Sequence, residues 1–290
     1  LYSIPTANRG LIVLVIRKLL ASSSYALIET FEVLRNRLEK LYQGTKSASA
    51  QEGFDLFWAY VEDEIDESGL EEEEDPDTAF QKQQIQEEMD EVDAILATAE
   101  RIKVNAKIIA LKQAIHTALK FQEEHGIPQK VVIFTESKRT QKYIAAELRR
   151  EGFEEDDILL FNGDFDDAMT KEIYRAWQVK NHGNTNYGRS VEYKHAIVDY
   201  FREHARILIV TDAGSEGLNL QFCNTVINYD LPWNPQKIEQ RIGRCHRYGQ
   251  EHDVVAVNLL NTQNEADRRV YEILSKKFEL FEGVFGASDV

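Results

Sequence analysis

One stretch, QRIGRCHRYGQ at residues 240–250, concentrates positive charge in a chain whose formal net charge is -16. Arg241, Arg244 and Arg247 recur every three residues, and Lys237 adds a fourth cation before them. On a helix this spacing places the arginines on one face. Two neighbouring guanidinium groups can each bond bidentately to a polyphosphate. The stretch therefore indicates an anion-binding helix face, and a solvated basic face paired with nearby glutamates is the alternative.

Two local signals complete this picture. Asn234 and Pro235 precede the arginines and are typical of an N-cap and a first helical residue. Upstream, TDAGSEGLNLQ (211–221) holds Gly214 and Gly217 between hydroxyl residues. Glycine lets a backbone approach a ligand closely, and exposed amides suit phosphate or ribose oxygens. A purely structural turn would use the same residues, so that alternative stays open.

The elements that must position these residues are short apolar, β-branched runs separated by helical patterns. Strands are predicted at 131–135, 158–161, 206–211, 225–229 and 254–260. Helices are predicted at 138–150, 166–178, 192–204 and 235–247. Strands that are apolar throughout and alternate with helices predict an α/β fold, a parallel sheet with helices on both faces. Ligands in such folds lie at the carboxyl ends of the strands, where the polar stretches follow.

The chain before this region has a different character. Residues 1–98 are predicted to be a helical segment, with a stripe of Leu27, Phe31, Leu34, Leu38 and Leu41 in a helix over 10–42. An acidic, partly disordered insert is expected at 61–78, which holds eleven acidic residues and no basic ones. A helical pattern then runs from about residue 81 to 125 and ends at Gly126 and Pro128. The second domain is expected over residues 99–290.

Composition excludes several classes of protein. No apolar run reaches the roughly 18 residues that a membrane span needs, so no membrane partner is expected. Two cysteines support no disulfide framework and suit a reducing compartment. We therefore expect a cytoplasmic protein, of which this chain is a part. Because the acidic insert supplies most of the net charge, a local basic surface is compatible with the overall charge.

The order of the motifs resembles the second RecA-like lobe of superfamily 2 helicases, specifically of the Swi/Snf-type ATP-dependent DNA translocases. The resemblance covers about residues 100 to 285. VVIFTESK (131–138) looks like motif IV, ILIVTDAGSEGLNLQ (207–221) like motif V and QRIGRCHRYGQ like motif VI. The closing HRYGQ is typical of the Swi/Snf branch.

The resemblance implies two sets of site residues. Arg244 and Arg247 would be catalytic, as arginine fingers that reach ATP held by the other lobe. The other ATP-binding residues would be Gln240, Gly217, Asn219 and Arg241, although Arg241 has a packing role as its alternative. Nucleic-acid backbone contacts would come from Thr135, Ser137, Lys138, Thr211, Gly214 and Ser215. Trp233 is either a base-stacking platform or a packing residue. No metal ligands are expected, since Cys245, His246 and His252 match no common spacing.

Two motifs of a complete motor are missing from this sequence. There is no G-x-x-x-x-G-K-[ST], GTKS at 44–47 has the wrong order, and DEID at 63–66 follows no apolar strand. ATP and Mg²⁺ would therefore be held mainly by an N-terminal RecA-like lobe, and we expect the chain alone to be inactive as an ATP hydrolase. The other partners implied are double-stranded DNA and a protein bound to DNA. The alternatives are a strand-separating DNA or RNA helicase and a non-catalytic interaction module.

Overall fold

The structure is a computed structural model, and it describes residues 24–43, 82–101, 106–163, 165, 167–181, 188–232, 234–261, 268 and 271–272. The chain divides into two compact units, Leu1–Asn105 and Ala106–Val290. The acidic insert, GTKS, DEID and Trp233 lie outside the described residues. The sequence also predicts an amphipathic helix over 265–282, and most of that segment lies outside the described residues as well. Among the residues described, no helix combines the length and apolar character needed to cross a bilayer.

In the first unit, two helices pack against each other: α2 (Ser24–Tyr42) and α4 (Lys82–Glu100). The predicted stripe is buried at Leu27, Phe31, Leu34 and Leu38, which confirms its inward orientation. Arg35 Nε donates to Asp93 Oδ1 at 3.0 Å and links the two helices at their surface. The helical pattern predicted over 81–125 is two helices, because α4 ends before the second unit begins with α5 (Ala106–Glu124).

The second unit is built on a five-stranded parallel sheet with the strand order β2-β3-β1-β4-β5. The strands are β1 (Val131–Phe134), β2 (Ile158–Phe161), β3 (Ile207–Val210), β4 (Thr225–Asn228) and β5 (Val255–Asn258). The helices after α5 are α6 (Lys138–Glu151), α7 (Ala168–Lys180), α8 (Arg189–Glu203), α9 (Asp212–Ser215) and α10 (Pro235–Cys245), with a 3-10 turn at Glu155–Asp157. Every strand predicted in this unit is present, as are the four helices predicted between residues 138 and 247, with ends within three residues of the prediction.

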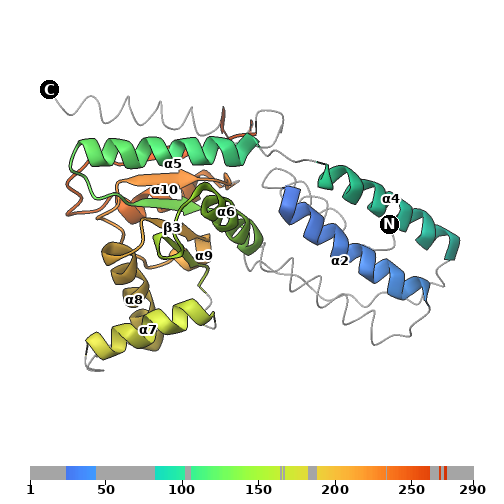
Figure 1. Ribbon diagram of the computed structural model, residues 1–290, viewed down its shortest axis with the longest axis horizontal. Helices are drawn as coiled ribbons and strands as arrows, with labels where there is room; N and C mark the ends of the chain where they lie inside the picture. The colour runs from blue at the N-terminus through green and yellow to red at the C-terminus, as the bar shows by residue number, and fades with distance from the viewer. Residues whose placement is uncertain are drawn as a thin grey trace. The chain divides into compact units, whose positions relative to one another are not determined.

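Helices cover the sheet on both faces, and α5 and α8 lie on opposite sides of it (Figure 1). Alternate residues of one strand enter different cores: Val132 and Phe134 pack with α7 and α8, whereas Val131 and Ile133 pack with α5 and α6. All four of these side chains have an exposed fraction of 0%. Burial on both faces explains why the strands are apolar throughout rather than alternating. The predicted RecA-like α/β architecture is confirmed.

Candidate functional site

The arginine helix α10 begins where the sequence indicates. Asn234 is its N-cap, with the side-chain oxygen accepting from Gln236 N at 3.0 Å, and Pro235 occupies the first turn. These residues follow β4, so the helix starts at the carboxyl edge of the sheet. The cap satisfies one backbone donor that a helix start leaves free, and proline has no such donor there to lose.

Arg241 lies in the interior of the unit, with 1% of it exposed. Its Nε and Nη2 donate to the carboxylate oxygens of Asp212 at 2.6 and 2.9 Å. Its Nη1 donates to Asn228 Oδ1 at 3.1 Å and to the Asp230 carbonyl at 2.7 Å. The guanidinium also lies 5.1 Å from the centroid of the Phe134 ring. These contacts differ from the predicted ATP-binding role and match the packing alternative, because the donors are already used within the unit.

Arg244 is half-buried and its Nε is buried without a hydrogen-bond acceptor among the described residues. Burial, and then the charge of Arg247 nearby, lower the pKa of the Arg244 guanidinium. Both effects disfavour the charged form, yet an arginine stays protonated in proteins. The charges of Glu216 and Asp212 act in the opposite direction, and an anion at this position would supply the missing acceptor.

The other residues predicted to meet a nucleotide are on the surface. Arg247 is exposed, and its Nε donates to the Gly243 carbonyl at 2.8 Å. Gln240 and Asn219 are also exposed, and the Asn219 amide lies 3.4 Å from Gln221 Oε1. Gly217 is exposed with a φ of 75°, a left-handed conformation that glycine adopts without strain.

The hydroxyl residues predicted to contact nucleic acid have different surroundings from those expected at motif IV. Thr135 has an exposed fraction of 0%, and its Oγ1 donates to Asp230 Oδ2 at 2.6 Å. Ser137 is 1% exposed and is the N-cap of α6, where its side chain accepts from the amides of Arg139 and Thr140. Both hydroxyls bond within the unit, and their contact with nucleic acid stays a prediction.

The motif V hydroxyls also bond within the unit. Thr211 is the N-cap of α9 and accepts from Gly214 N at 3.2 Å. Ser215 Oγ donates to the Asp212 carbonyl at 2.8 Å. Gly214 is buried, and a Cβ added there would lie 2.6 Å from the Phe161 carbonyl oxygen, so the turn packs against β2. Of the six predicted nucleic-acid residues, only Lys138 has a partly exposed side chain.

Three residues that the sequence motifs did not single out hold the site together. Asp212 and Asp230 follow the ends of β3 and β4, and both bond to Arg241. Asp230 also pairs with Lys107 at 3.1 Å, with side chains 7% and 9% exposed. Gln250 Nε2 donates to the Cys223 carbonyl at 3.0 Å. In the sequence, Asp212 and Asp230 could have been recognised because each directly follows a predicted strand, at 206–211 and at 225–229.

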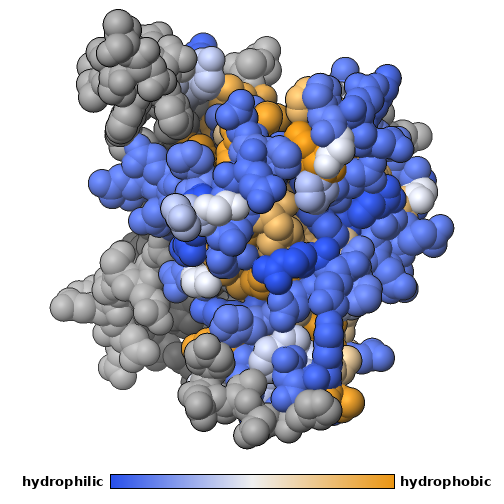
Figure 2. Space-filling model, turned by 90° about the vertical axis from the view of Figure 1, so that its left-hand side faces the viewer, coloured by the Kyte–Doolittle hydropathy of each residue, from blue (hydrophilic) through white to orange (hydrophobic). Residues whose placement is uncertain are grey.

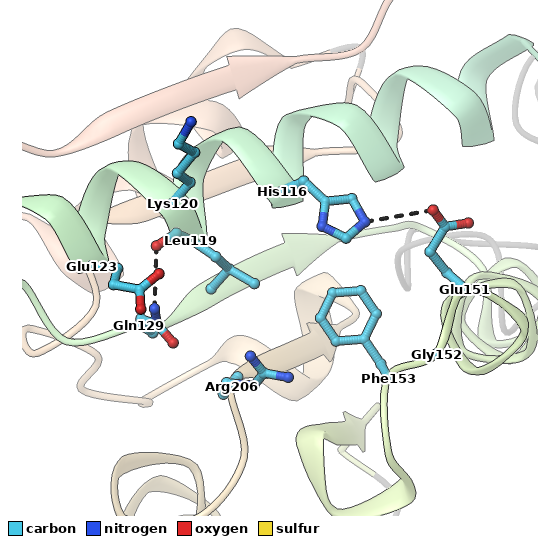
Figure 3. Close-up of a pocket in the computed structure, with 9 residues that line it drawn as sticks. All are labelled: His116, Leu119, Lys120, Glu123, Gln129, Glu151, Gly152, Phe153 and Arg206. Carbon is cyan, nitrogen blue, oxygen red and sulfur yellow. Dashed lines mark hydrogen bonds and ion pairs between the residues drawn. The ribbon is translucent and has the colours of Figure 1, made fainter.

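A pocket lies at the opposite edge of the sheet, beside the amino ends of the strands (Figure 3). It is lined by His116, Leu119, Lys120, Glu123, Gln129, Glu151, Gly152, Phe153 and Arg206. Arg206 is engaged in a bidentate pair with Asp157, at 2.7 and 2.8 Å.

The face on the left of Figure 1 is mainly hydrophilic, with smaller hydrophobic patches (Figure 2). The candidate site is the arginine helix, because the buried Nε of Arg244 lies there without an acceptor among the described residues.

The comparisons with known proteins agree with this architecture. Residues 106–249 match the helicase conserved C-terminal domain. The chain is 40% identical over 163 residues to the uncharacterized ATP-dependent helicase YqhH of Bacillus subtilis, an alignment that covers 56% of this chain and 24% of that protein. It is 43% identical over 70 residues to the RNA polymerase-associated protein RapA of Vibrio campbellii, which covers 23% of this chain and 7% of that protein.

A solved structure of the C-terminal part of the Fun30 ATPase domain aligns with a TM-score of 0.47 and 17% identity, over 93% of this chain and 73% of that one. The chain spans about a quarter or less of the length of the curated relatives it matches. The domain match and the sequence relatives carry the assignment. Residues 106–249 are a helicase conserved C-terminal domain, and the relatives that share sequence with the chain include an ATP-dependent helicase.

Proposed function

We propose that this unit is the second motor lobe of an ATP-dependent, Swi/Snf-type DNA translocase, and that Arg244 and Arg247 act as its arginine fingers. The observation that carries the proposal is the buried Nε of Arg244, which has no acceptor among the described residues. Exposed Arg247 lies close enough to lower the pKa of Arg244. Two such cations suit the γ-phosphate of a nucleotide, where negative charge must be stabilised during transfer.

The nucleotide itself would be held mainly by an N-terminal RecA-like lobe. Within the described residues, no group of three or more His, Cys, Asp or Glu side chains could hold a metal ion. Mg²⁺, which neutralises phosphate charge when bound, is therefore assigned to the other lobe. On this side, exposed Gln240, Gly217 and Asn219 are proposed to line the nucleotide. Arg241 is left out of the nucleotide contacts because its donors are used internally.

Duplex DNA is the proposed track. Among the predicted contact residues, Lys138 retains the exposure that a phosphate contact needs. Thr135, Ser137, Thr211, Gly214 and Ser215 are proposed to shape the DNA-facing loops from within. Closure of two lobes around ATP and their reopening after hydrolysis would then move the protein along DNA. A DNA-bound protein is the proposed obstacle or target, and the setting is the cytoplasm and its nucleoid.

The test replaces Arg247 by alanine in a protein that joins this chain to its N-terminal lobe. We expect the DNA-stimulated ATPase rate to fall by about tenfold or more, as for other arginine fingers. Nucleotide affinity should change little, because the other lobe holds the nucleotide. Arg202→Ala is the matched control, since Arg202 is also exposed but lies on α8 and pairs with Asp199 at 3.1 Å. An unchanged ATPase rate in Arg247→Ala would identify a non-catalytic module instead.

A second measurement separates translocation from strand separation. ATPase stimulation by duplex DNA, single-stranded DNA and RNA is compared in the same two-lobe protein, together with displacement of a labelled strand. A duplex translocase is stimulated most by duplex DNA and leaves the strands paired. Strand displacement, or stronger stimulation by RNA, would overturn the duplex assignment while leaving the arginine assignment intact.

A further inference from the structure

Arg241 connects the arginine helix to the two loops that precede it in the sheet. Its bidentate bond to Asp212 reaches the start of α9, and its bond to the Asp230 carbonyl reaches the end of β4. Asp230 in turn accepts from Lys107 of α5 and from Thr135 at the end of β1. One buried guanidinium therefore ties α10 to elements from three neighbouring strands and from α5.

The far end of α10 is fixed as well. The Leu220 amide donates to the Arg244 carbonyl at 3.0 Å, which joins the loop after α9 to the last turn of the helix. Gln250 Nε2 donates to the carbonyls of Cys223 and Cys245, at 3.0 and 3.3 Å. The helix segment between Arg241 and Cys245 is thus held at both ends, and Arg244 lies within it.

We infer that Arg241, together with Asp212, is a positioning pair that presents Arg244 and Arg247 in a fixed orientation. The inference rests on the proposed function, because it assumes that the two exposed or half-exposed arginines act on a nucleotide. Catalytic groups must be held within a fraction of an ångström of their productive place, which their supporting contacts achieve. Arg241 is 1% exposed and its guanidinium bonds within the unit, so its role is to position rather than to contact the nucleotide.

A general structural role is the competing interpretation, and the chain contains a pair that controls for it. Arg206 and Asp157 form a bidentate bond with nearly the same distances, at the amino edge of the sheet. This pair joins the 3-10 turn before β2 to the residue before β3. It contacts none of the arginines of α10. Asp157→Asn therefore removes the same kind of bond without touching the proposed positioning contacts.

The experiment compares Asp212→Asn with Asp157→Asn in a protein that carries both motor lobes. Asp212→Asn keeps the side-chain shape but loses the second charged acceptor of the fork. We expect kcat for DNA-stimulated ATP hydrolysis to fall at least about fivefold, with KM for ATP within about twofold, because the fingers act in the transition state. Asp157→Asn is expected to leave both constants within about twofold. Asp212→Glu keeps two charged acceptors and should recover part of kcat.

Thermal unfolding of each variant accompanies the kinetics, and Arg241→Lys serves as a second variant if Asp212→Asn does not fold. Equal kcat losses in folded Asp212→Asn and Asp157→Asn would show a structural role only and overturn the inference. The same holds if Asp212→Asn and Arg241→Lys both fold and retain kcat. The proposed function fails separately, if Arg247→Ala retains the ATPase rate. A low rate in Arg247→Ala with an unchanged rate in Asp212→Asn would therefore refute the positioning pair alone.

Discussion

Two arginine–aspartate pairs of similar geometry stand at opposite ends of one parallel sheet. Arg241 and Asp212, at the carboxyl ends, bond at 2.6 and 2.9 Å, whereas Arg206 and Asp157, at the amino ends, bond at 2.7 and 2.8 Å. The side chain of Arg241 is 1% exposed and that of Arg206 is 38% exposed. Among the described residues, Arg241 alone of the two arginines has further acceptors, in Asn228 and Asp230. Two bidentate pairs of similar geometry are therefore expected to contribute differently to stability, because they differ in burial and in the number of additional partners.

Replacing each arginine by alanine should give the largest difference in unfolding free energy between the two pairs. Arg241→Ala leaves the Asp230 carbonyl and a partly buried Asp212 carboxylate without their partner, and we expect a loss of about 3–5 kcal/mol in unfolding free energy. Arg206→Ala breaks a partly exposed pair, for which about 1 kcal/mol or less is expected. Urea unfolding followed by circular dichroism measures both. Similar losses in the two variants would show that burial does not separate the pairs.

Glycine-to-alanine substitutions compare how closely the backbone is packed at the carboxyl and amino ends of the strands. A Cβ on Gly214, at the carboxyl edge, would lie 2.6 Å from the Phe161 carbonyl and 2.9 Å from Asn162 backbone atoms. Because backbone atoms cannot easily move aside, Gly214→Ala should cost about 2 kcal/mol or more. Gly152, at the amino edge, has open space but a φ of 106°, so Gly152→Ala should cost only about 1 kcal/mol. The midpoint of thermal unfolding ranks them, and the reverse order would contradict the close packing of motif V on β2.

Acid should lower the stability that the Arg206–Asp157 pair contributes, by a small amount. The hydrogen bond from Arg206 lowers the pKa of Asp157 below its ordinary value. A carboxylate with a lowered pKa contributes stability above its unfolded pKa, about 3.9, and that contribution is lost as pH falls through the lower folded value. Since the pair is partly exposed, we expect less than about 1 kcal/mol. Unfolding free energies from pH 6 to pH 2 should fall less steeply in Asp157→Asn, and an identical slope would refute the linkage.

Local sequence patterns were sufficient for the elements but not for the contacts between them. Asn234 and Pro235 fix the start of α10 through neighbouring residues, and continuous apolar runs identify strands covered on both faces. The pairing of Arg241 with Asp212 spans 29 positions, and no spacing rule relates a helix to a loop that far away. The pairing could be inferred only once the sheet had placed the ends of β3 and β4 on either side of β1.

The hydroxyl residues show a second reason why sequence reasoning stopped short. A threonine or serine oxygen that accepts from backbone amides caps a helix, and the same group can also contact a phosphate. Thr211 and Ser137 lie directly before α9 and α6, where they act as caps. Thr135 differs, because its hydroxyl meets the Asp230 carboxylate from another strand. The sequence alone does not show which partner a serine or threonine hydroxyl binds, because that depends on which groups the fold places near it.

The acceptor-free Nε of Arg244 has a consequence for how such a lobe can be improved by selection or by design. A buried donor without a partner costs about 1–3 kcal/mol, so many replacements at this position would make the separate lobe more robust. With Arg244 in place the lobe is less stable, but the Nε donor is available to an acceptor on a bound molecule. A search for thermostable variants of this domain would therefore tend to remove the residue on which its proposed activity depends.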